Sequence, residues 1–247
     1  YKIPDSQAAA AVREGLDLGY RLIDTAAAYD NERGVGSGFV SADDAFLTTK
    51  LWNDRQGHSE AIAAFEESLA LLGRDHVDLY LIHWPCAKQG KFVDTWKALI
   101  ELRDSGRAKS IGVSNFLPEH LDAIIDATGV VPAVNQIELH PHHQQRDLTA
   151  YHRNRGIVTQ AWTPLGRGAA FEEDAIRRIA EKHGKSPAQV IIRWHIDKGH
   201  SAIPKAASLE HRKSNLDVLD WSLSDDEIAA IDALEKADGA VIGRIDC

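Results

Sequence analysis

The chain of 247 residues contains no methionine and only two cysteines, Cys86 and Cys247. Two cysteines cannot form the network of disulfides that stabilises small secreted domains, and a chain of this length can bury a sufficient core without one. We therefore expect both cysteines to be reduced and the protein to be cytoplasmic. Because methionine is absent and the sequence begins at Tyr1, we also expect it to be part of a longer translation product.

Basic residues are scarce relative to acidic ones. The sequence has 28 Lys and Arg against 37 Asp and Glu, which gives a formal net charge of −9. This balance argues against nucleic acid and anionic membrane surfaces as partners, since both attract a basic face. The longest apolar runs fall far short of the ~20 residues that cross a bilayer, so no membrane span is expected. Hydrophobic residues make up 44% of the chain, a value that excludes general disorder.

Short apolar runs alternate regularly with amphipathic helical stretches along the chain. The runs typical of buried parallel strands are residues 20–23, 45–49, 77–82, 110–113, 133–137, 157–161 and 201–204. Seven such strand–helix repeats indicate an α/β protein, which could be a doubly wound sheet or a (β/α)₈ TIM barrel. The length and even spacing favour the barrel, which typically needs about 250 residues. We therefore predict a single barrel domain over residues 1–247, whose eighth strand precedes or includes Tyr1 and is truncated in this chain.

The helical stretches between these runs have recognisable ends. Residues that cap or begin a helix precede an apolar periodicity of about 3.6 residues, and glycines follow it. The expected signals are Asp5 or Ser6 with Gly19, Ser59 with Gly73, Pro118 and Pro187 in first turns, and a capping box of Ser224 and Glu227 for a helix through Leu234. The connections at residues 36–46 and 239–247 are expected to be abbreviated.

Polar side chains gather where the predicted strands end. In a barrel of parallel strands these ends form one face, which carries the chemistry. The residues at the strand ends are Asp24, Lys50, His83, Ser114 with Asn115, Gln136, Trp162 and Lys205, and Tyr29 follows Asp24 by five residues. Their convergence on one rim indicates a catalytic or binding site.

Lys50 ends an apolar strand, where an unpaired ammonium group would be strongly disfavoured. We expect Asp24 to be its counter-charge, and the pair to lower the pKa of Tyr29 toward neutrality so that Tyr29 acts as a general acid. His83 would then polarise a carbonyl oxygen. Two alternatives remain: the ion pair could be purely structural, or Lys50 could form a Schiff base. The second is disfavoured because a salt-bridged lysine is held protonated.

Six segments of the chain resemble the aldo-keto reductase superfamily, and in particular its bacterial branch of 2,5-diketo-D-gluconate reductases. The segments are DTAAAYDNERGVG (24–36), TTKLW (48–52), DLYLIHWP (78–85), IGVSNF (111–116), NQIELHP (135–141) and IPK (203–205). The resemblance extends from Tyr1 to about Gly239. It implies a monomeric (β/α)₈ barrel that reduces small-molecule aldehydes and ketones with NADPH. Some relatives act as channel-associated subunits, so a cofactor-binding regulatory protein with little turnover is the alternative.

The resemblance also implies roles for individual residues. Asp24, Tyr29, Lys50 and His83 correspond to the catalytic tetrad of the superfamily. The implied cofactor-binding residues are Ser114, Asn115 and Gln136 for the nicotinamide carboxamide, Trp162 stacked on the nicotinamide, Leu165 over the pyrophosphate, Lys205 with His211 and Arg212 near the ribose phosphate, and Asn215 on the adenine. Trp52 and Trp84 correspond to aromatic walls of the substrate pocket, and Tyr1 would lie at its rim.

The phosphate-binding segment departs from the family pattern. The family usually has a serine directly after the lysine and an arginine six residues after it, whereas this chain has Ala206 and His211, with Arg212 one position later. A neutral imidazole pairs poorly with phosphate, while arginine gives bidentate charged hydrogen bonds. Because Lys205 remains and Arg212 is close, NADPH is the predicted cofactor, and use of NADH stays open.

The histidines at positions 140, 142 and 143 resemble a metal cluster. No cysteine or carboxylate spacing completes a tetrahedral ligand set around them. Pro141 indicates a surface loop instead, so no metal is expected.

Overall fold

The computed structural model describes residues 1–39, 45–242 and 247. The predictions for residues 36–46 and 239–247 fall in part on residues 40–44 and 243–246, which lie outside the described residues. The chain divides into two compact units, one formed by Tyr1–Asn135 with the C-terminal Cys247 and one by Gln136–Arg244. The single domain over residues 1–247 stays a prediction.

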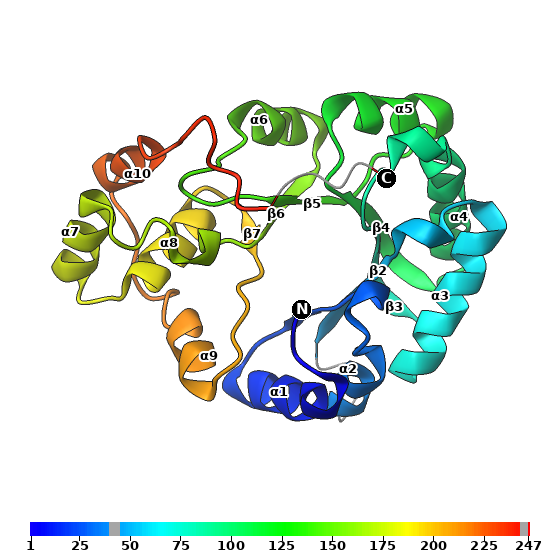
Figure 1. Cartoon of the computed structure of the whole chain (residues 1–247), viewed down its shortest axis with the longest axis horizontal. Coiled ribbons are helices and arrows are strands. Elements are labelled where there is room, and N and C mark those ends of the chain that lie inside the picture. The colour runs from blue at the N-terminus through cyan, green and yellow to red at the C-terminus, as the bar shows by residue number, and fades with distance from the viewer. Residues whose placement is uncertain (40–44, 243–246) are drawn as a thin grey trace. The chain divides into compact units, whose positions relative to one another are not determined.

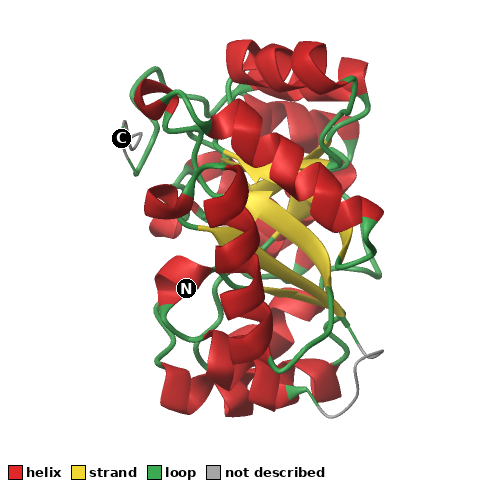
Figure 2. Ribbon diagram, turned by 90° about the vertical axis from the view of Figure 1, so that its right-hand side faces the viewer, coloured by secondary structure: helices red, strands yellow, loops and turns green. Residues whose placement is uncertain are grey.

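The first unit alternates parallel strands with helices (Figure 1). The register pairs Leu22 with Phe46, Thr48 with Leu79, and Tyr80 with Ile111. Helices α1 and α2 lie side by side, as do α3 and α4. Figure 2 shows helices in front of the strands on the side where α3 and α4 lie. The elements are α1 (Asp5–Leu18), β1 (Leu22–Asp24), η1 (Ala27–Tyr29), α2 (Glu32–Gly38), β2 (Phe46–Leu51), η2 (Asn53–Arg55), α3 (His58–Leu72), β3 (Val77–Ile82), η3 (Ala87–Gln89), α4 (Phe92–Asp104), β4 (Ala108–Ser114) and α5 (Pro118–Thr128).

The second unit contains the end of β5 (Val134–Glu138), which begins in the first unit. Its β6 and β7 run parallel, and Gln160 pairs with Ser201. Helix α7 packs against α8 and α10. The elements are α6 (Arg146–Arg155), β6 (Val158–Trp162), η4 (Gly166–Gly168), α7 (Asp174–His183), α8 (Pro187–Asp197), β7 (Ser201–Ala202), α9 (Leu209–Leu216) and α10 (Asp225–Asp232).

The seven strands follow one another in chain order, β1 to β7. A doubly wound sheet reverses its strand order at a switch point, so sequential order contradicts that alternative and agrees with a (β/α)₈ barrel. All seven predicted strands are present, with ends that differ by a few residues. The α/β class and barrel topology are thereby confirmed, whereas the eighth strand before Tyr1 stays a prediction.

Most predicted helix ends are confirmed. Gly19 and Gly73 end α1 and α3 in the left-handed conformation that glycine adopts without strain. Pro118 and Pro187 begin α5 and α8. The capping box of Ser224 and Glu227 begins α10, which ends at Asp232, two residues earlier than expected.

The prediction for the start of α3 was wrong. Gly57 is the N-cap residue, and Ser59 lies inside the first turn, where its hydroxyl contacts Glu60. The hydroxyl of Thr95 accepts a hydrogen bond from the Gly57 amide at 2.9 Å and fixes this entry to the helix.

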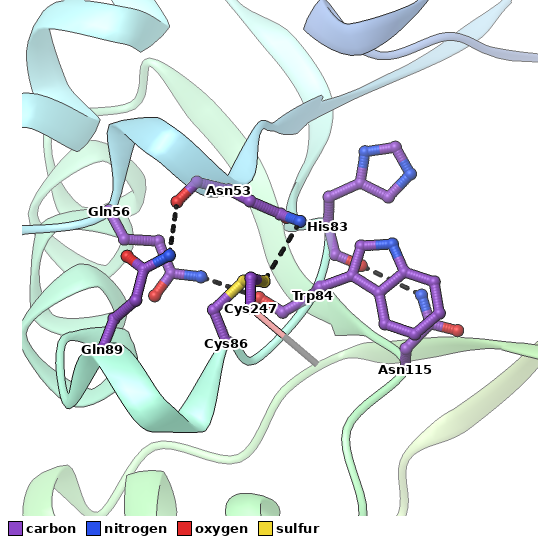
Figure 3. The surroundings of a disulfide bond; sticks show 8 residues. All are labelled: Asn53, Gln56, His83, Trp84, Cys86, Gln89, Asn115 and Cys247. Atoms are coloured by element: carbon purple, nitrogen blue, oxygen red, sulfur yellow. Dashed lines mark hydrogen bonds between the residues drawn. A yellow bond between two sulfur atoms is a disulfide. The ribbon is translucent and has the colours of Figure 1, made fainter. Parts of the chain in front are cut away.

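The prediction of reduced cysteines was wrong, because Cys86 and Cys247 form a disulfide within the first unit (Figure 3). The two residues are 161 positions apart in sequence, and their Cα atoms lie 4.8 Å apart. Cys86 is buried and follows the end of β3 by four residues. Sequence spacing alone carries no information about such a long-range approach.

Removal of this disulfide should lower the stability of the first unit. The closed loop is long, so its loss restores chain entropy to the unfolded state worth about 2–5 kcal/mol. The variants Cys86→Ser and Cys247→Ser should lose the same free energy of urea unfolding, and wild type in dithiothreitol should match them. A loss confined to Cys86→Ser would point to packing at this buried position and contradict the prediction.

Two buried histidines and one half-buried histidine should make the second unit acid-sensitive. Burial lowers the pKa of His195 to about 3, and that of His152 and of His200 to about 4. Since these values lie below the ordinary 6.5, their contribution to stability is complete above pH 6.5. It is lost as the pH falls toward 4, at about 1.4 kcal/mol per pH unit and histidine.

The measurement is urea unfolding of wild type and His195→Gln between pH 7 and pH 4. The variant should show a shallower loss than wild type, whereas the matched surface variant His58→Gln should follow wild type. Equal slopes in wild type and His195→Gln would contradict the prediction.

Candidate active site

The four predicted catalytic side chains come from neighbouring segments of the first unit. Asp24 is the last residue of β1, Lys50 is the fifth residue of β2, and His83 directly follows β3. Tyr29 ends η1 in the loop after β1. The register pairs Asp24 with Thr48 and Lys50 with Leu81, so the strand ends that carry these side chains meet at one edge of the sheet.

The Lys50 side chain is fully buried and reaches three acceptors. Its Nζ lies 2.6 Å from Oδ2 of Asp24 and 2.8 Å from the carbonyl oxygen of Thr25. The third contact, to the hydroxyl of Tyr29, is longer at 3.5 Å, and the ammonium group lies 5.0 Å from the Tyr29 ring centroid. The predicted Asp24–Lys50 pair beside Tyr29 is therefore present.

The protonation states follow from these contacts. Burial acts to lower the pKa of Lys50, but the Asp24 charge and the hydrogen bonds of Asp24 and Tyr29 raise it above its ordinary value. Lys50 is thus a charged group and a poor nucleophile, which disfavours Schiff-base chemistry. The prediction that Lys50 lowers the pKa of Tyr29 overall was wrong. Burial raises this pKa, and the attraction of Lys50 offsets it only in part.

The raised pKa means that Tyr29 holds its proton at neutral pH. His83 is also nearly buried, and burial together with the charge of Lys50 lowers its pKa well below the ordinary value. His83 is therefore a neutral imidazole at neutral pH. Its ring centroid lies 5.7 Å from that of Tyr29, so two neutral donors stand side by side.

Aromatic side chains adjoin this pair. The Tyr1 ring packs edge-on against Tyr29 at 5.3 Å, and the Trp52 ring packs against His83 at 5.0 Å. The third predicted pocket residue, Trp84, is buried, and its carbonyl accepts a hydrogen bond from Gln56 (Figure 3). Tyr1 and Trp52 thus contact two of the predicted catalytic residues, Tyr29 and His83. Trp84 directly follows His83 in the sequence.

Ser114 and Asn115 lie at the end of β4. Asn115 has a left-handed backbone with φ 64°, a conformation that asparagine tolerates better than most residues. Its Nδ2 donates to the carbonyl of His83 and to Oγ of Ser114, each at 3.0 Å, as Figure 3 shows for His83. This pair is therefore hydrogen-bonded directly to the backbone of His83.

The remaining predicted cofactor residues belong to the second unit. Gln136 is buried in β5 and donates to Gln160 at 2.7 Å. Trp162 is the last residue of β6, and Leu165 precedes η4. Trp162 and Leu165 lie at or beyond the carboxyl end of β6, as predicted, whereas Gln136 is the middle residue of β5.

The predicted phosphate-binding residues lie between β7 and the end of α9. Lys205 is exposed, whereas Arg212 is buried and donates to the carbonyls of Ala206 and Ala207 at 3.0 and 3.2 Å. His211 is exposed, and its backbone amide donates to the N-cap residue Ser208. Asn215 is buried in the same helix. Lys205 and Arg212 thus provide two cations in one short segment.

Two of the three histidines considered for a metal site contact carboxylates. Nε2 of His140 lies 3.2 Å from Glu138, and Nε2 of His142 lies 2.8 Å from Glu173. Across residues 1–39, 45–242 and 247, no group of three or more His, Cys, Asp and Glu side chains could hold a metal ion. In the same residues no helix is long and apolar enough to cross a membrane.

The sequence analysis did not predict two polar groups that contribute to this site. One is the carbonyl of Thr25, which accepts from Lys50, and the other is the side chain of Asn31, which accepts from the Thr25 hydroxyl at 2.7 Å. Both lie inside the segment DTAAAYDNERGVG. A main-chain acceptor leaves no signature in a residue pattern, and an asparagine before a helix is typical of a cap.

The comparisons with known proteins agree with this geometry. The model of the aldo/keto reductase family matches residues 1–236. The chain belongs to the aldo/keto reductase family. Its expected activity, the NADPH-dependent reduction of carbonyl groups, is confirmed at the level of this family.

Relatives and solved structures cover nearly the whole reductase. An aldo-keto reductase of Mycolicibacterium smegmatis is 52% identical over 95% of this chain and 87% of its own length. Methylglyoxal reductase DkgA of Escherichia coli K12 is 46% identical over 92% of this chain and 84% of its own. The apo crystal structure of Gox0644 is 51% identical over 98% of this chain and 90% of its own, with a TM-score of 0.97.

The residues of this reductase fit NADPH in their chemistry. Structures of a Gox0644 variant with NADPH and of the Bombyx mori aldo-keto reductase with NADP are also similar to it, with TM-scores of 0.96 and 0.88. In this chain, amide and hydroxyl groups suit a carboxamide, and the Lys205 and Arg212 cations suit a phosphate. Which residue makes which contact stays a prediction.

Replacement of Tyr29 should separate chemistry from binding. Tyr29→Phe removes the acidic proton but retains the ring that packs against Tyr1 and His83, so turnover should fall by more than about 100-fold. The measurement is NADPH oxidation with an aldehyde, together with NADPH affinity by titration. Affinity should stay close to that of wild type. Substantial remaining turnover would show that another group donates the proton.

Proposed function

We propose that this reductase converts small aldehydes and ketones, with α-oxoaldehydes such as methylglyoxal as the leading substrate class, into alcohols, with Tyr29 as the proton donor. The observation that carries the proposal is the buried Lys50 ammonium group, shared between Asp24, Thr25 and Tyr29. The substrate class is supported by the relatives named methylglyoxal reductase and by the aromatic side chains beside Tyr29.

The proposed mechanism assigns each side chain one task. NADPH, when bound, supplies a hydride to the carbonyl carbon. Tyr29 gives its proton to the carbonyl oxygen, and the Lys50 charge stabilises the tyrosinate that this leaves. Neutral His83 donates a hydrogen bond to the same oxygen and orients it. Asp24 compensates the charge of Lys50, so that no net charge is buried.

The proposal extends to the binding residues. In the first unit, Ser114 and Asn115 bind the nicotinamide carboxamide, and Tyr1, Trp52 and Trp84 line the substrate pocket. In the second unit, Gln136 and Trp162 contact the nicotinamide, Leu165 covers the pyrophosphate, Lys205 with Arg212 or His211 holds the ribose phosphate, and Asn215 contacts the adenine.

We further propose that the reductase is bacterial and acts as a monomer, which size-exclusion chromatography would check. A cytoplasmic location also stays a prediction. The Cys86–Cys247 disulfide argues against a cytoplasmic location, because such bonds persist mainly in oxidising compartments.

The decisive experiment follows the absorbance of the reduced nicotinamide with methylglyoxal and a panel of aldehydes and ketoses. Turnover with NADPH that depends on Tyr29 would support the proposal. Tight NADPH binding without turnover for any substrate would favour a regulatory protein of the same fold.

The choice between NADPH and NADH should depend on the segment from Lys205 to Arg212. Lys205→Ala removes one charged hydrogen bond to the extra phosphate, worth about 1.5–3 kcal/mol, so it should weaken NADPH roughly 10- to 100-fold. NADH binding should change little. His211→Arg should shift the preference further toward NADPH, and steady-state kinetics with both cofactors would measure it. An equal effect of Lys205→Ala on both cofactors would contradict this assignment.

A further inference from the structure

We propose that the Thr25–Asn31 pair is the positioning element for proton transfer, because it closes the loop that carries Tyr29 and fixes one of the three acceptors of Lys50. Neither residue touches the reacting atoms in this proposal. They act through Tyr29 and Lys50, so the inference rests on the proposed function of these two groups.

The loop from Thr25 to Asn31 is closed by one buried side-chain hydrogen bond. The hydroxyl of Thr25 donates to Oδ1 of Asn31 at 2.7 Å, and both side chains are almost fully buried. The backbone amide of Thr25 donates to Thr48 of β2 at 2.9 Å, which anchors the start of the loop to the sheet. Tyr29 therefore lies in a short loop whose two ends are tied together.

The same threonine holds the catalytic lysine. The carbonyl of Thr25 accepts from Nζ of Lys50 at 2.8 Å, closer than the 3.5 Å contact between Lys50 and Tyr29. Any rotation of the Thr25 backbone would therefore move the ammonium group relative to the tyrosine hydroxyl. A displacement of about 1 Å in a reacting group can reduce a rate 100-fold.

Asn31 is placed to cap a helix but does not do so. It is the N-cap residue of α2, where an asparagine side chain normally accepts from the amides of the first turn. No side-chain capping bond is present at this helix start, and the amide group of Asn31 is used elsewhere. Its Oδ1 serves Thr25, and its Nδ2 donates to the carbonyl of Ile3 at 3.0 Å.

The hydrogen bond from Asn31 to the Ile3 carbonyl connects the Tyr29 loop to the proposed substrate pocket. Ile3 belongs to the segment that begins with Tyr1, whose ring packs on Tyr29 at 5.3 Å. Asn31 thus links the catalytic loop to an aromatic residue of the proposed substrate pocket. A residue that only stabilised α2 would need neither contact.

The test compares Thr25→Val, Thr25→Ser and Asn31→Ala with a matched control, Thr95→Val. Thr95 is also fully buried, and its hydroxyl also stabilises the start of a helix. That helix is α3, where the Thr95 hydroxyl accepts a hydrogen bond from the Gly57 amide. Thr25→Val and Asn31→Ala should lower kcat for methylglyoxal about 10- to 100-fold. Their NADPH affinity should remain within about twofold of wild type, since a change in kcat alone reports an interaction used in the chemical step. Thr25→Ser, which retains the hydroxyl, should restore the rate, and Thr95→Val should lower the Tm alone.

A second readout does not require turnover. The ionisation of Tyr29 is obtained as the ultraviolet pH titration of each protein minus that of its Tyr29→Phe counterpart. Displacement of Lys50 should shift this titration in Thr25→Val and leave it unchanged in Thr95→Val. Equal behaviour of Thr25→Val and Thr95→Val in both readouts, or failure of Thr25→Ser to restore the rate, would overturn the positioning role. An inactive wild type whose Tyr29 titration still shifts in Thr25→Val would instead contradict the proposed function.

Discussion

The burial of the Lys50 ammonium group is the constraint on which the first unit depends. A buried charge is tolerated only if a counter-charge and hydrogen-bond acceptors surround it. Asp24 supplies the charge, and Thr25 and Tyr29 supply acceptors. Three neighbouring parts of the chain, the end of β1, the loop after it and β2, are therefore held in one arrangement by a single cation. The same arrangement places a neutral tyrosine and a neutral histidine beside each other.

Residue patterns predicted the strands and the Asp24–Lys50 pair because both depend on local rules. Lys50 at the end of an apolar strand requires a partner, and the parallel alternation puts Asp24 on the adjacent strand. The predicted direction of the pKa shift of Tyr29 was wrong, because the shift depends on how deeply the whole loop buries the ring. They also missed the disulfide, since a contact between residues 86 and 247 follows from the complete fold.

The proposed phosphate-binding segment of the second unit differs in burial from the proposed catalytic residues of the first. The tetrad is buried and its charges are compensated, whereas Lys205 and His211 are exposed. An exposed cation contributes less than a buried one, because water and salt screen it. Arg212 is the buried member of this segment, and its guanidinium group is held by backbone carbonyls. The segment that departs from the family pattern therefore carries one exposed cation, Lys205, and one cation fixed by the backbone, Arg212.

The Cys86–Cys247 bond changes the covalent connectivity of the chain. Residues 136–244 form the second unit, and the first unit contains both the residues before them and Cys247 after them. With the disulfide formed, the second unit is attached to the first at both of its ends, in the manner of an inserted domain. A single backbone cut between Cys86 and Cys247 would consequently leave two pieces that stay covalently joined. After such a cut the oxidised reductase would remain one covalent molecule, whereas the reduced reductase would consist of two.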